Sequence, residues 1–573
     1  MKRNTFFYSL AVIVAVLLLS SGLIFYWLLS DSPLILWQSG KVVDPSAAIF
    51  VPKQAPAMVS LLVNPDRLAK LELVKTSPGN RRQARAELNE IKRTLQINTG
   101  LDYAEDISPW LGDEVTLALT NLDIDRNSSN GEQKGFLLAL ATKNSQLSSQ
   151  FLDSFWQKQA IAGVNLNFEQ YKGVKIIYSL QARKANRQNL GTVATALIGN
   201  KFVLFANDLK VLRDAINNVQ DPGLNLKNSA DYQQALQRLK ERQIGFTFVN
   251  LAELNGGDLA PPNPPILGGD SEKEGTANSV LSLAIAFGLN PQGLVAQTAF
   301  LTSDGGITTN LPVLSQPVEA LKYLPAQSAL AIGGSDLHEL FVELSGLINN
   351  DNILGSLLGK PLSSLEKTWG IKLPEEIFNW VQGEYALGLL NNSDPKQQDW
   401  IFVAEKSPET DAAVARLDAI AKKQGFSIGA LELQNQPVLI WTKLMSVPAN
   451  SKGDSSLVLK AEVQGVHATI GKYEIFATSV EAMNKALAAP QNSLLASGDF
   501  MASVAALPQP NQGYLYLNWL AVKKNLERQL PILQIVEKVG KPLFNNLRSL
   551  TFSIRYDRDD RVGNGNIFMR LGK

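Results

Sequence analysis

A short motif occurs twice in this chain, and the duplication constrains the fold more than any other feature. The first copy reads SPWLGDEVTLAL, with Trp110 four positions before Glu114. The second copy reads NWVQGEYALGLL, with Trp380 four positions before Glu384. Self-similarity at a fixed spacing is typical of a duplicated structural unit.

Further matches follow in the same order along the chain. ALIGNKFVLFAND resembles ATIGKYEIFATS and pairs Gly199 with Gly471, and GFTFVNL resembles GYLYLNW and pairs Asn250 with Asn518. SADYQQAL likewise resembles SGDFMASV, and the segment beginning SLAIAF resembles the segment beginning SLTFSI. Because a collinear series of matches is hard to produce by chance, we interpret the chain as a tandem duplication.

Each copy alternates strand-like and helix-like segments. AMVSLLVN has the period-two alternation of a half-buried strand. An amphipathic helix is predicted to begin at Ser145 and to end at Gly163. Tight turns such as Gly199-Asn200 join strand-like segments directly, which favours antiparallel pairing over a parallel sheet.

An apolar segment, FFYSLAVIVAVLLLSSGLIFYWLL, lies near the N-terminus and contains no charged residue. A helix of this length would cross a ~30 Å hydrocarbon core. Lys2 and Arg3 precede the segment and Asp31 follows it, which predicts a cytoplasmic N-terminus. The alternative is a cleaved signal peptide, whose apolar region is normally shorter and ends at a small-residue cleavage site. We predict an uncleaved signal anchor at 6–29.

The predicted fold class is therefore α+β, with an N-terminal transmembrane helix followed by two tandem, duplicated antiparallel-sheet-plus-helix domains. The predicted parts are a cytoplasmic N-terminus at 1–5, the transmembrane signal anchor at 6–29, a linker at 30–44, the first α+β repeat at 45–305, a linker at 306–317 and the second α+β repeat at 318–573.

The two copies differ most after their matching VNL and LNW segments. The first continues with a Pro/Gly-rich loop at 255–275, which predicts neither a helix nor a central strand. The second continues with apolar residues at helical spacing over 523–547. The loop could bind a ligand or partner where the first copy lacks a helix, or it could be a tolerated surface insertion.

Composition excludes several kinds of protein. The chain has no cysteine, which rules out disulfides, thiolate nucleophiles and Cys-ligated metal centres. Its net charge is +1 at pH 7 and no long Lys/Arg run occurs, which argues against a nucleic-acid-binding protein.

Catalytic patterns are missing as well. The chain has two histidines, His338 and His467, far apart in the sequence. We interpret His338 as a residue at the surface of a helix and His467 as a structural residue within a strand; a general-base role is the alternative for His338. Neither G-x-S-x-G nor H-E-x-x-H occurs. We predict no catalytic, cofactor-binding or metal-binding residue, and no cofactor.

The Trp/Glu motif has a structural interpretation. We expect each tryptophan to cover the sheet edge where the chain enters a strand, and each glutamate to accept hydrogen bonds from backbone N–H groups at the preceding turn; a binding role is the alternative. The predicted structural residues of the repeat are Trp110, Glu114, Gly199, Asn250, Trp380, Glu384, Gly471 and Asn518.

Three segments together resemble a known family: the apolar N-terminal segment, VPKQAPAMVSLLVNP and PWLGDEVTLAL. This family consists of uncharacterised bacterial, mainly cyanobacterial, membrane-anchored proteins recorded only as a domain of unknown function. The resemblance covers nearly the whole chain. It implies a location outside the cytoplasm and a cyanobacterial type of source, and it implies no catalytic or binding residue.

Three functions are compatible with the sequence. The first is a membrane-anchored extracytoplasmic scaffold or assembly factor without enzymatic activity. The second is a binding module for a lipid, pigment or envelope polymer in a cleft between the repeats, and the third is a hydrolase. We expect a single-pass protein in the periplasm or thylakoid lumen, with the membrane contacted through 6–29. We expect other membrane or envelope proteins as partners, and no nucleic acid.

Overall fold

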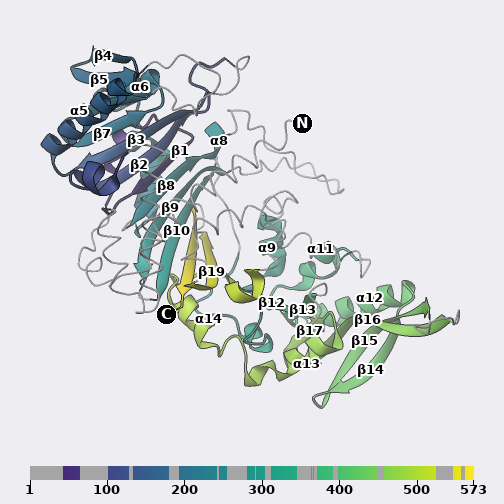
Figure 1. Cartoon of the computed structure of the whole chain (residues 1–573). Helices are drawn as coiled ribbons and strands as arrows, with labels where there is room; N and C mark the ends of the chain where they lie inside the picture. The colour runs from purple at the N-terminus through teal and green to yellow at the C-terminus, as the bar shows by residue number, and fades with distance from the viewer. Residues whose placement is uncertain are drawn as a thin grey trace. The chain divides into compact units, whose positions relative to one another are not determined.

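The structure is a computed structural model of the chain (Figure 1). It describes residues 43–64, 101–127, 133–179, 193–241, 244–254, 280–290, 292–302, 311–344, 363, 366, 371–391, 398–448, 457–523, 546–556 and 562–572. The chain divides into two compact units. The first comprises 1–306 with the short segments 535–546 and 561–564, and the second comprises 307–534, 547–560 and 565–573.

Ten described strands belong to the first half of the chain. They are β1 (Ala57–Leu61), β2 (Leu111–Asn121), β3 (Gly135–Thr142), β4 (Leu166–Tyr171), β5 (Val174–Ser179), β6 (Ala194–Ile198), β7 (Phe202–Ala206), β8 (Gly245–Asn250), β9 (Val280–Asn290) and β10 (Gly293–Thr302). Their hydrogen-bonded order is β10-β9-β8-β1-β2-β3-β7-β6-β5-β4, and every pair is antiparallel.

Several helices of the first unit begin at polar side chains that accept hydrogen bonds from free N–H groups. The described helices are η1 (Ser46–Ile49), the π-helix η2 (Tyr103–Ile107), α5 (Ser145–Ile161), α6 (Leu209–Gln220), η4 (Leu226–Asn228), α7 (Ala230–Arg238) and α8 (Leu251–Leu254). Asn144 caps α5, Asp208 caps α6 and Ser229 caps α7. The caps explain where these segments leave extended structure.

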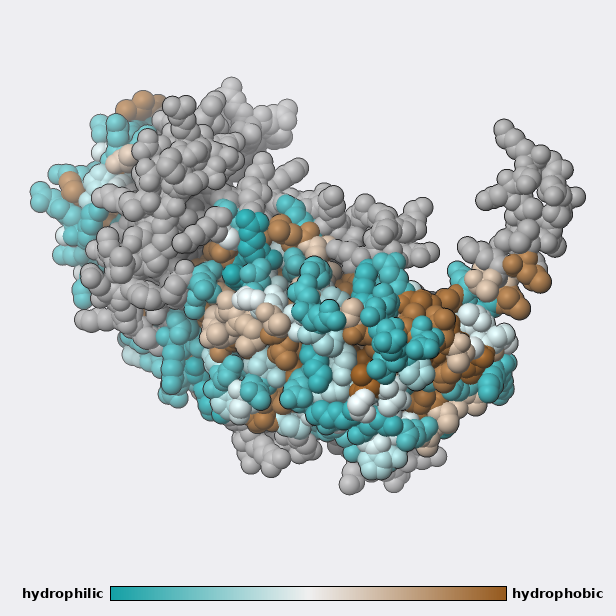
Figure 2. Space-filling view, turned by 90° about the horizontal axis from the view of Figure 1, so that it is seen from below, coloured by the Kyte–Doolittle hydropathy of each residue, from teal (hydrophilic) through white to brown (hydrophobic). Residues whose placement is uncertain are grey.

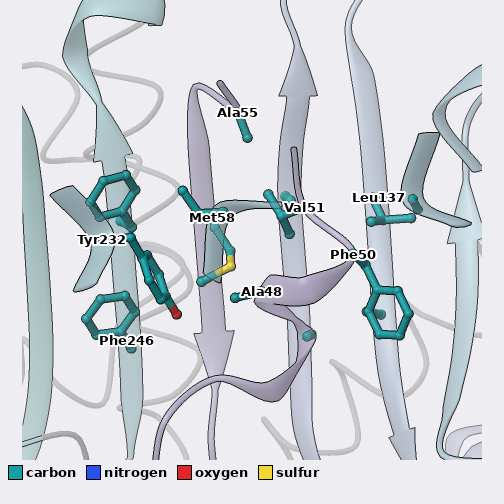
Figure 3. Packing of buried hydrophobic residues seen from close by; sticks show 14 of the residues in the cluster. Ala48, Phe50, Val51, Ala55, Met58, Leu137, Tyr232 and Phe246 are labelled. Carbon is teal, nitrogen blue, oxygen red and sulfur yellow. The ribbon is translucent and has the colours of Figure 1, made fainter. Parts of the chain in front are cut away.

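The main core of the first unit lies on the sheet face that η1, α6 and α7 cover. Figure 3 shows Met58 of β1 with Tyr232 and Phe246 to one side and Phe50 and Leu137 to the other. Tyr232 and Phe246 meet edge to face, with ring centroids 5.6 Å apart. Every one of these side chains is buried, so residues from α7, from three strands and from the end of η1 share one apolar layer.

Ten further strands belong to the second half of the chain. They are β11 (Leu330–Ser335), β12 (Glu384–Asn391), β13 (Gln398–Glu405), β14 (Ser427–Leu433), β15 (Gln436–Pro448), β16 (Leu457–Ile470), β17 (Tyr473–Ala477), β18 (Tyr514–Asn518), β19 (Leu547–Tyr556) and β20 (Val562–Leu571). Their order is β20-β19-β18-β11-β12-β13-β17-β16-β15-β14. When each strand of the second half is matched to the strand numbered ten lower, this order is the same as that of the first half.

The second unit has a helix at most of the corresponding places. Its described helices are η5 (Glu319–Tyr323), α9 (Leu337–Leu344), α11 (Leu373–Glu376), η7 (Phe378–Trp380), α12 (Thr410–Lys423), α13 (Val480–Ala488), η8 (Ala489–Gln491) and α14 (Gly498–Ala505). A shared strand order is expected when two copies keep the same alternating apolar faces, because a slip of one residue would expose the whole face.

The predicted fold class is wrong as stated. The described strands belong to one antiparallel sheet of 20 strands with helices, whereas we predicted two separate sheet domains behind a transmembrane helix. Alternation and turns define individual strands and their neighbours, but they carry no information about how far a sheet extends.

None of the helices in the described ranges has the length and apolarity needed to cross a membrane. The predicted anchor at 6–29 lies outside those ranges, and so does the loop at 255–275. Of the predicted helix at 523–547, residues 524–545 are also outside them. A hydropathy pattern measures the length of an apolar run and does not establish a helix, so the transmembrane part of the prediction has no support. The predicted domain boundaries stay predictions.

Candidate functional site

Trp110 is anchored at the point where η2 leads into β2. Its indole Nε1 donates a hydrogen bond to the Asp106 carbonyl oxygen at 2.7 Å, and its side chain is 1% exposed. The ring packs on Phe151 of α5, with centroids 5.1 Å apart. Both contacts fix the tryptophan between the turn and a helix, and they leave its polar edge no free donor for a ligand.

Glu114 accepts hydrogen bonds from the N–H groups at the N-terminus of η1. This helix lies more than sixty residues earlier in the chain than Glu114. Its Oε1 accepts from the Ala47 backbone N–H at 2.8 Å, and its Oε2 accepts from the Ser46 N–H at 3.0 Å. Thr116 donates to the same carboxylate. The prediction of backbone N–H donors was right in kind, but the prediction that they belong to the preceding turn was wrong. Burial raises the pKa of Glu114, and the backbone hydrogen bonds oppose that rise.

Replacing Glu114 with glutamine is expected to make the stability of the first unit less dependent on pH. Glutamine has one carbonyl acceptor and one donor group, as the protonated carboxyl has, so the variant and the wild type should be similarly stable in acid. Because the folded pKa of Glu114 is raised, its stabilising contribution is complete below the ordinary value of 4.5 and declines as pH rises through the folded pKa.

The wild type should therefore match Glu114→Gln in acid and should become less stable than the variant as the pH rises through the folded pKa. Urea unfolding measured at several pH values checks this result. A wild type that gains stability over the variant as the pH rises would show that the ionised carboxylate is the form that the fold prefers.

In the second unit the tryptophan keeps its role and the glutamate does not. Trp380 is buried, and its Nε1 donates to the Glu376 carbonyl oxygen at 3.0 Å. Glu384 instead accepts from the Tyr473 hydroxyl at 2.7 Å, and its own N–H donates to Glu405 Oε2. Burial and then the hydrogen bond to Glu384 raise the pKa of Tyr473. The prediction that Glu384 accepts hydrogen bonds from backbone N–H groups is therefore wrong, because its donor is the Tyr473 hydroxyl.

An aromatic exchange accompanies this change of partner. In the first unit Phe50 meets Phe202 edge to face, with ring centroids 5.1 Å apart. In the second, Tyr323 meets Tyr473 in the same way at 5.5 Å. The hydroxyl that Tyr473 adds at the β17 position is the donor that Glu384 uses, so one substitution in the hairpin redirects the glutamate.

The remaining predicted residues form turns and caps. Gly199 and Gly471 have φ of +55° and +58° in the tight turns before β7 and β17, a conformation that favours glycine. Asn250 accepts from the Glu253 N–H, and Asn518 accepts from the Ala521 N–H, where each strand gives way to a helical turn. The structure brings none of the eight predicted residues into a shared catalytic cluster within the described ranges.

His467 is the centre of a buried polar network in the second unit. The residue is 4% exposed, and its ring stacks on Phe476 at 5.6 Å. Its Nδ1 lies 3.0 Å from Glu474 Oε1, and its Nε2 lies 3.2 Å from Asp418 Oδ1. Each ring nitrogen therefore lies within hydrogen-bonding distance of one carboxylate. His338, in contrast, lies exposed on α9.

Other side chains complete this network and fill its hydrogen-bonding capacity. Trp441 Nε1 donates to Asp418 Oδ1 at 2.8 Å, and the Thr469 hydroxyl donates to Glu474 Oε2 at 2.6 Å. The network joins α12 to β15, β16 and β17, and the hydroxyl of its exposed member, Thr469, is engaged by Glu474. Within the described residues, no three His, Asp or Glu side chains are arranged to hold a metal ion.

Sequence reasoning missed these partners. Thr469 and Glu474 pair directly across the β16–β17 turn, so the Gly471 turn could have placed Glu474 on the same face as His467. No local signal could have placed Asp418 there, because it comes from a helix 49 residues away.

The strands β15 and β16 extend beyond the length of their counterparts in the first unit. We call residues 443–448 and 457–462 the arm; they pair beyond a β-bulge that follows Trp441. The strands β15 and β16 have 13 and 14 residues, whereas their counterparts β5 and β6 have 6 and 5. Among the described strands, the arm is therefore an extension that only the second unit carries.

Leucines are exposed on this arm. Leu444 is 59% and Leu459 is 70% exposed. Leu444 pairs with Ala461 and Leu459 pairs with Ser446, which places both leucines on one face as diagonal neighbours. Figure 2 shows hydrophobic residues exposed in several patches among hydrophilic ones. The arm is the candidate interaction site because its apolar residues are adjacent and project from a two-stranded ribbon.

Comparison with known proteins gives a family but no activity. No curated protein matches the chain. A solved structure described as "Structure of crystal form I of TP0453" is 8% identical, and the aligned region covers 48% of this chain and 88% of that one, with a TM-score of 0.24. A TM-score this low carries no argument about fold or function.

A family model described as "Protein of unknown function (DUF3352)" matches residues 10–571. This match confirms the resemblance to a domain of unknown function and covers both copies of the repeat. The chain therefore belongs to the family described as Protein of unknown function (DUF3352).

Proposed function

We propose that the protein is a non-enzymatic interaction factor that binds a protein partner through the arm of the second unit. The observation that carries the proposal is the pair of adjacent exposed leucines, Leu444 and Leu459, on a ribbon without a counterpart among the described strands of the first unit. Isolated exposed leucines are normal on protein surfaces, but neighbouring ones on one face favour a contact with another molecule.

The composition of the arm favours a protein surface as the partner. Lys443 pairs with Glu462 on the face opposite the leucines, so this pair of opposite charge does not interrupt the leucine face. The buried centre of a protein interface is depleted in charged residues, as the leucine face is. The ribbon is two strands wide, and it therefore suits a partner with a shallow apolar groove.

The state of the ionisable groups supports the absence of catalysis in this proposal. His467, Asp418 and Glu474 use their polar atoms on one another and on Trp441 and Thr469. A general base needs an unengaged atom within reach of a substrate proton. Nothing in the described residues favours a hydrolase. The location and the membrane or envelope partners expected from the sequence stay predictions.

Replacing both arm leucines with serine is expected to weaken partner binding by about 100-fold or more. Burying a leucine side chain contributes about 1.5–3 kcal/mol, and each 1.4 kcal/mol corresponds to a factor of ten in affinity. The measurement is affinity purification of the tagged full chain from detergent-solubilised cells, followed by quantitative mass spectrometry of the retained proteins.

Leu520→Ser is the matched control, since Leu520 is 60% exposed and lies outside the arm. The proposal predicts a protein that the wild type and the control retain and that Leu444→Ser/Leu459→Ser loses. Equal retention by all three proteins would exclude the arm as the binding surface.

A further inference from the structure

The layer between α14 and the strands β18 and β19 contains hydroxyl groups at five positions where the first unit has only carbon. The second-unit residues are Ser503, Tyr514, Tyr516, Thr551 and Ser553, and their counterparts in the aligned segments of the first unit are Ala235, Phe246, Phe248, Ala284 and Ala286. Strand register supports this correspondence, because Tyr516 faces Thr551 as Phe248 faces Ala284. At these five positions the shared layer is apolar in the first copy and polar in the second, whereas Tyr232 of the first copy carries a hydroxyl where the second copy has Phe500.

Among the described residues, three of these hydroxyls, on Tyr514, Thr551 and Ser553, are buried without a hydrogen-bond partner. Thr551 is 0% and Ser553 is 2% exposed. Neither Thr551 Oγ1 nor Ser553 Oγ makes a hydrogen bond to any described residue. A buried hydroxyl without a partner costs free energy, and folded proteins rarely leave one unsatisfied unless water or another molecule completes it.

A chain of polar groups leads from the surface toward these hydroxyls. Asp499 forms an ion pair with Arg570 at the exposed end of α14. The Ser503 hydroxyl donates to the Asp499 carbonyl oxygen at 2.8 Å and lies 3.1 Å from the Ser549 hydroxyl. Ser549, Thr551 and Ser553 then follow one another on the same face of β19.

The corresponding strand of the first unit does not continue this chain. There the Ser282 hydroxyl, which corresponds to Ser549, donates to Asp231 at 3.4 Å. Ala284 and Ala286 follow Ser282 on β9, and both are fully buried. In the first copy the row of hydroxyl groups on this face of the strand therefore ends at Ser282. In the second copy the row continues from Ser549 to Thr551 and Ser553.

We infer that the second unit contains an internal site for a small, uncharged hydrogen-bonding molecule beside Thr551 and Ser553. Water is the smallest such molecule, and buried water normally binds two to four polar groups that lack protein partners. An uncharged occupant suits the site because hydroxyl groups carry no net charge to balance an ion. The site lies outside the arm and is independent of the proposed function.

Removing the two hydroxyls tests the inference directly. Oxygen-17 magnetic relaxation dispersion counts water molecules that stay bound for longer than the tumbling time of the protein. The full chain with Thr551→Val and Ser553→Ala is expected to hold fewer long-lived waters than the wild type. Ser60→Ala is the matched control, because Ser60 is equally buried but already bonds Thr116 at 2.7 Å, and it should leave the count unchanged.

Electron density in a high-resolution crystal structure of the wild type provides a second test that needs no variant. A peak within hydrogen-bonding distance of Thr551 Oγ1 or Ser553 Oγ supports the site, and its shape distinguishes a single water from a small organic molecule such as an alcohol. Empty density at both hydroxyls, together with an unchanged water count in the double variant, would overturn the inference.

Discussion

Replacing His467 with alanine is expected to lower the free energy of unfolding of the second unit by about 3–5 kcal/mol. The substitution leaves the buried carboxylate of Glu474 and the half-buried carboxylate of Asp418 without the imidazole between them. It also removes the ring that packs on Phe476 and Trp441. Cavity formation and the loss of both ring-nitrogen contacts act in the same direction.

Hydrogen exchange of the β16 and β17 amides, followed by mass spectrometry, measures this loss within the second unit. His338→Ala is the control, since that exposed residue should change stability by no more than about 0.5 kcal/mol. From the sequence alone, both substitutions are expected to stay within about 1 kcal/mol, and burial of the network revises that expectation for His467. A change below about 1 kcal/mol for His467→Ala would mean that the network contributes little.

Replacing Trp110 with alanine is expected to lower the free energy of unfolding of the first unit by about 3–5 kcal/mol. The change removes a fully buried side chain that packs on Phe151 and leaves the Asp106 carbonyl oxygen without its indole donor. Trp380→Ala should have a similar effect on the second unit, because Trp380 makes the same hydrogen bond to Glu376.

Exchange protection of β2 and α5 measures the first variant, and protection of β12 and α12 measures the second. Trp110→Phe keeps most of the buried volume and should cost less than Trp110→Ala. If either alanine variant loosened both units equally, the two motifs would not be acting within separate cores.

Much of each repeat follows from local patterns in the sequence. The helix predicted from Ser145 is confirmed as α5, and Gly163, with φ of +84°, ends it as predicted. The Gly199-Asn200 turn is confirmed between β6 and β7, since both residues have positive φ. These features depend on residues close together in the chain, whose backbone preferences act without tertiary context.

Features that depend on distant residues could not be predicted. Glu114 accepts hydrogen bonds from the backbone N–H groups of Ser46 and Ala47, whereas Glu384 accepts one from the Tyr473 hydroxyl on β17. The same motif therefore has two bonding patterns, because its partners lie on elements that diverged separately. The extent of the sheet was unpredictable for a related reason, since strand alternation does not reveal which edges pair.

The comparison of the two copies is more informative than either copy alone. A shared strand order separates the scaffold from what differs between the described residues of the two units, namely the arm and the hydroxyl-bearing layer on β18 and β19. Both features place side chains where folding does not require them: leucines in solvent and hydroxyls in a core. Residues of this kind are expected to be functional, because they cost stability in the isolated chain.

Site-specific photo-crosslinking at the arm tests the central claim most directly. A benzophenone amino acid in place of Leu459 should form a discrete adduct with one protein in intact cells, and Leu444→Ser in the same chain should abolish it. The same amino acid at Leu520 should form no such adduct. Failure to crosslink at position 459, or an identical adduct from position 520, would contradict a partner-binding role for the arm.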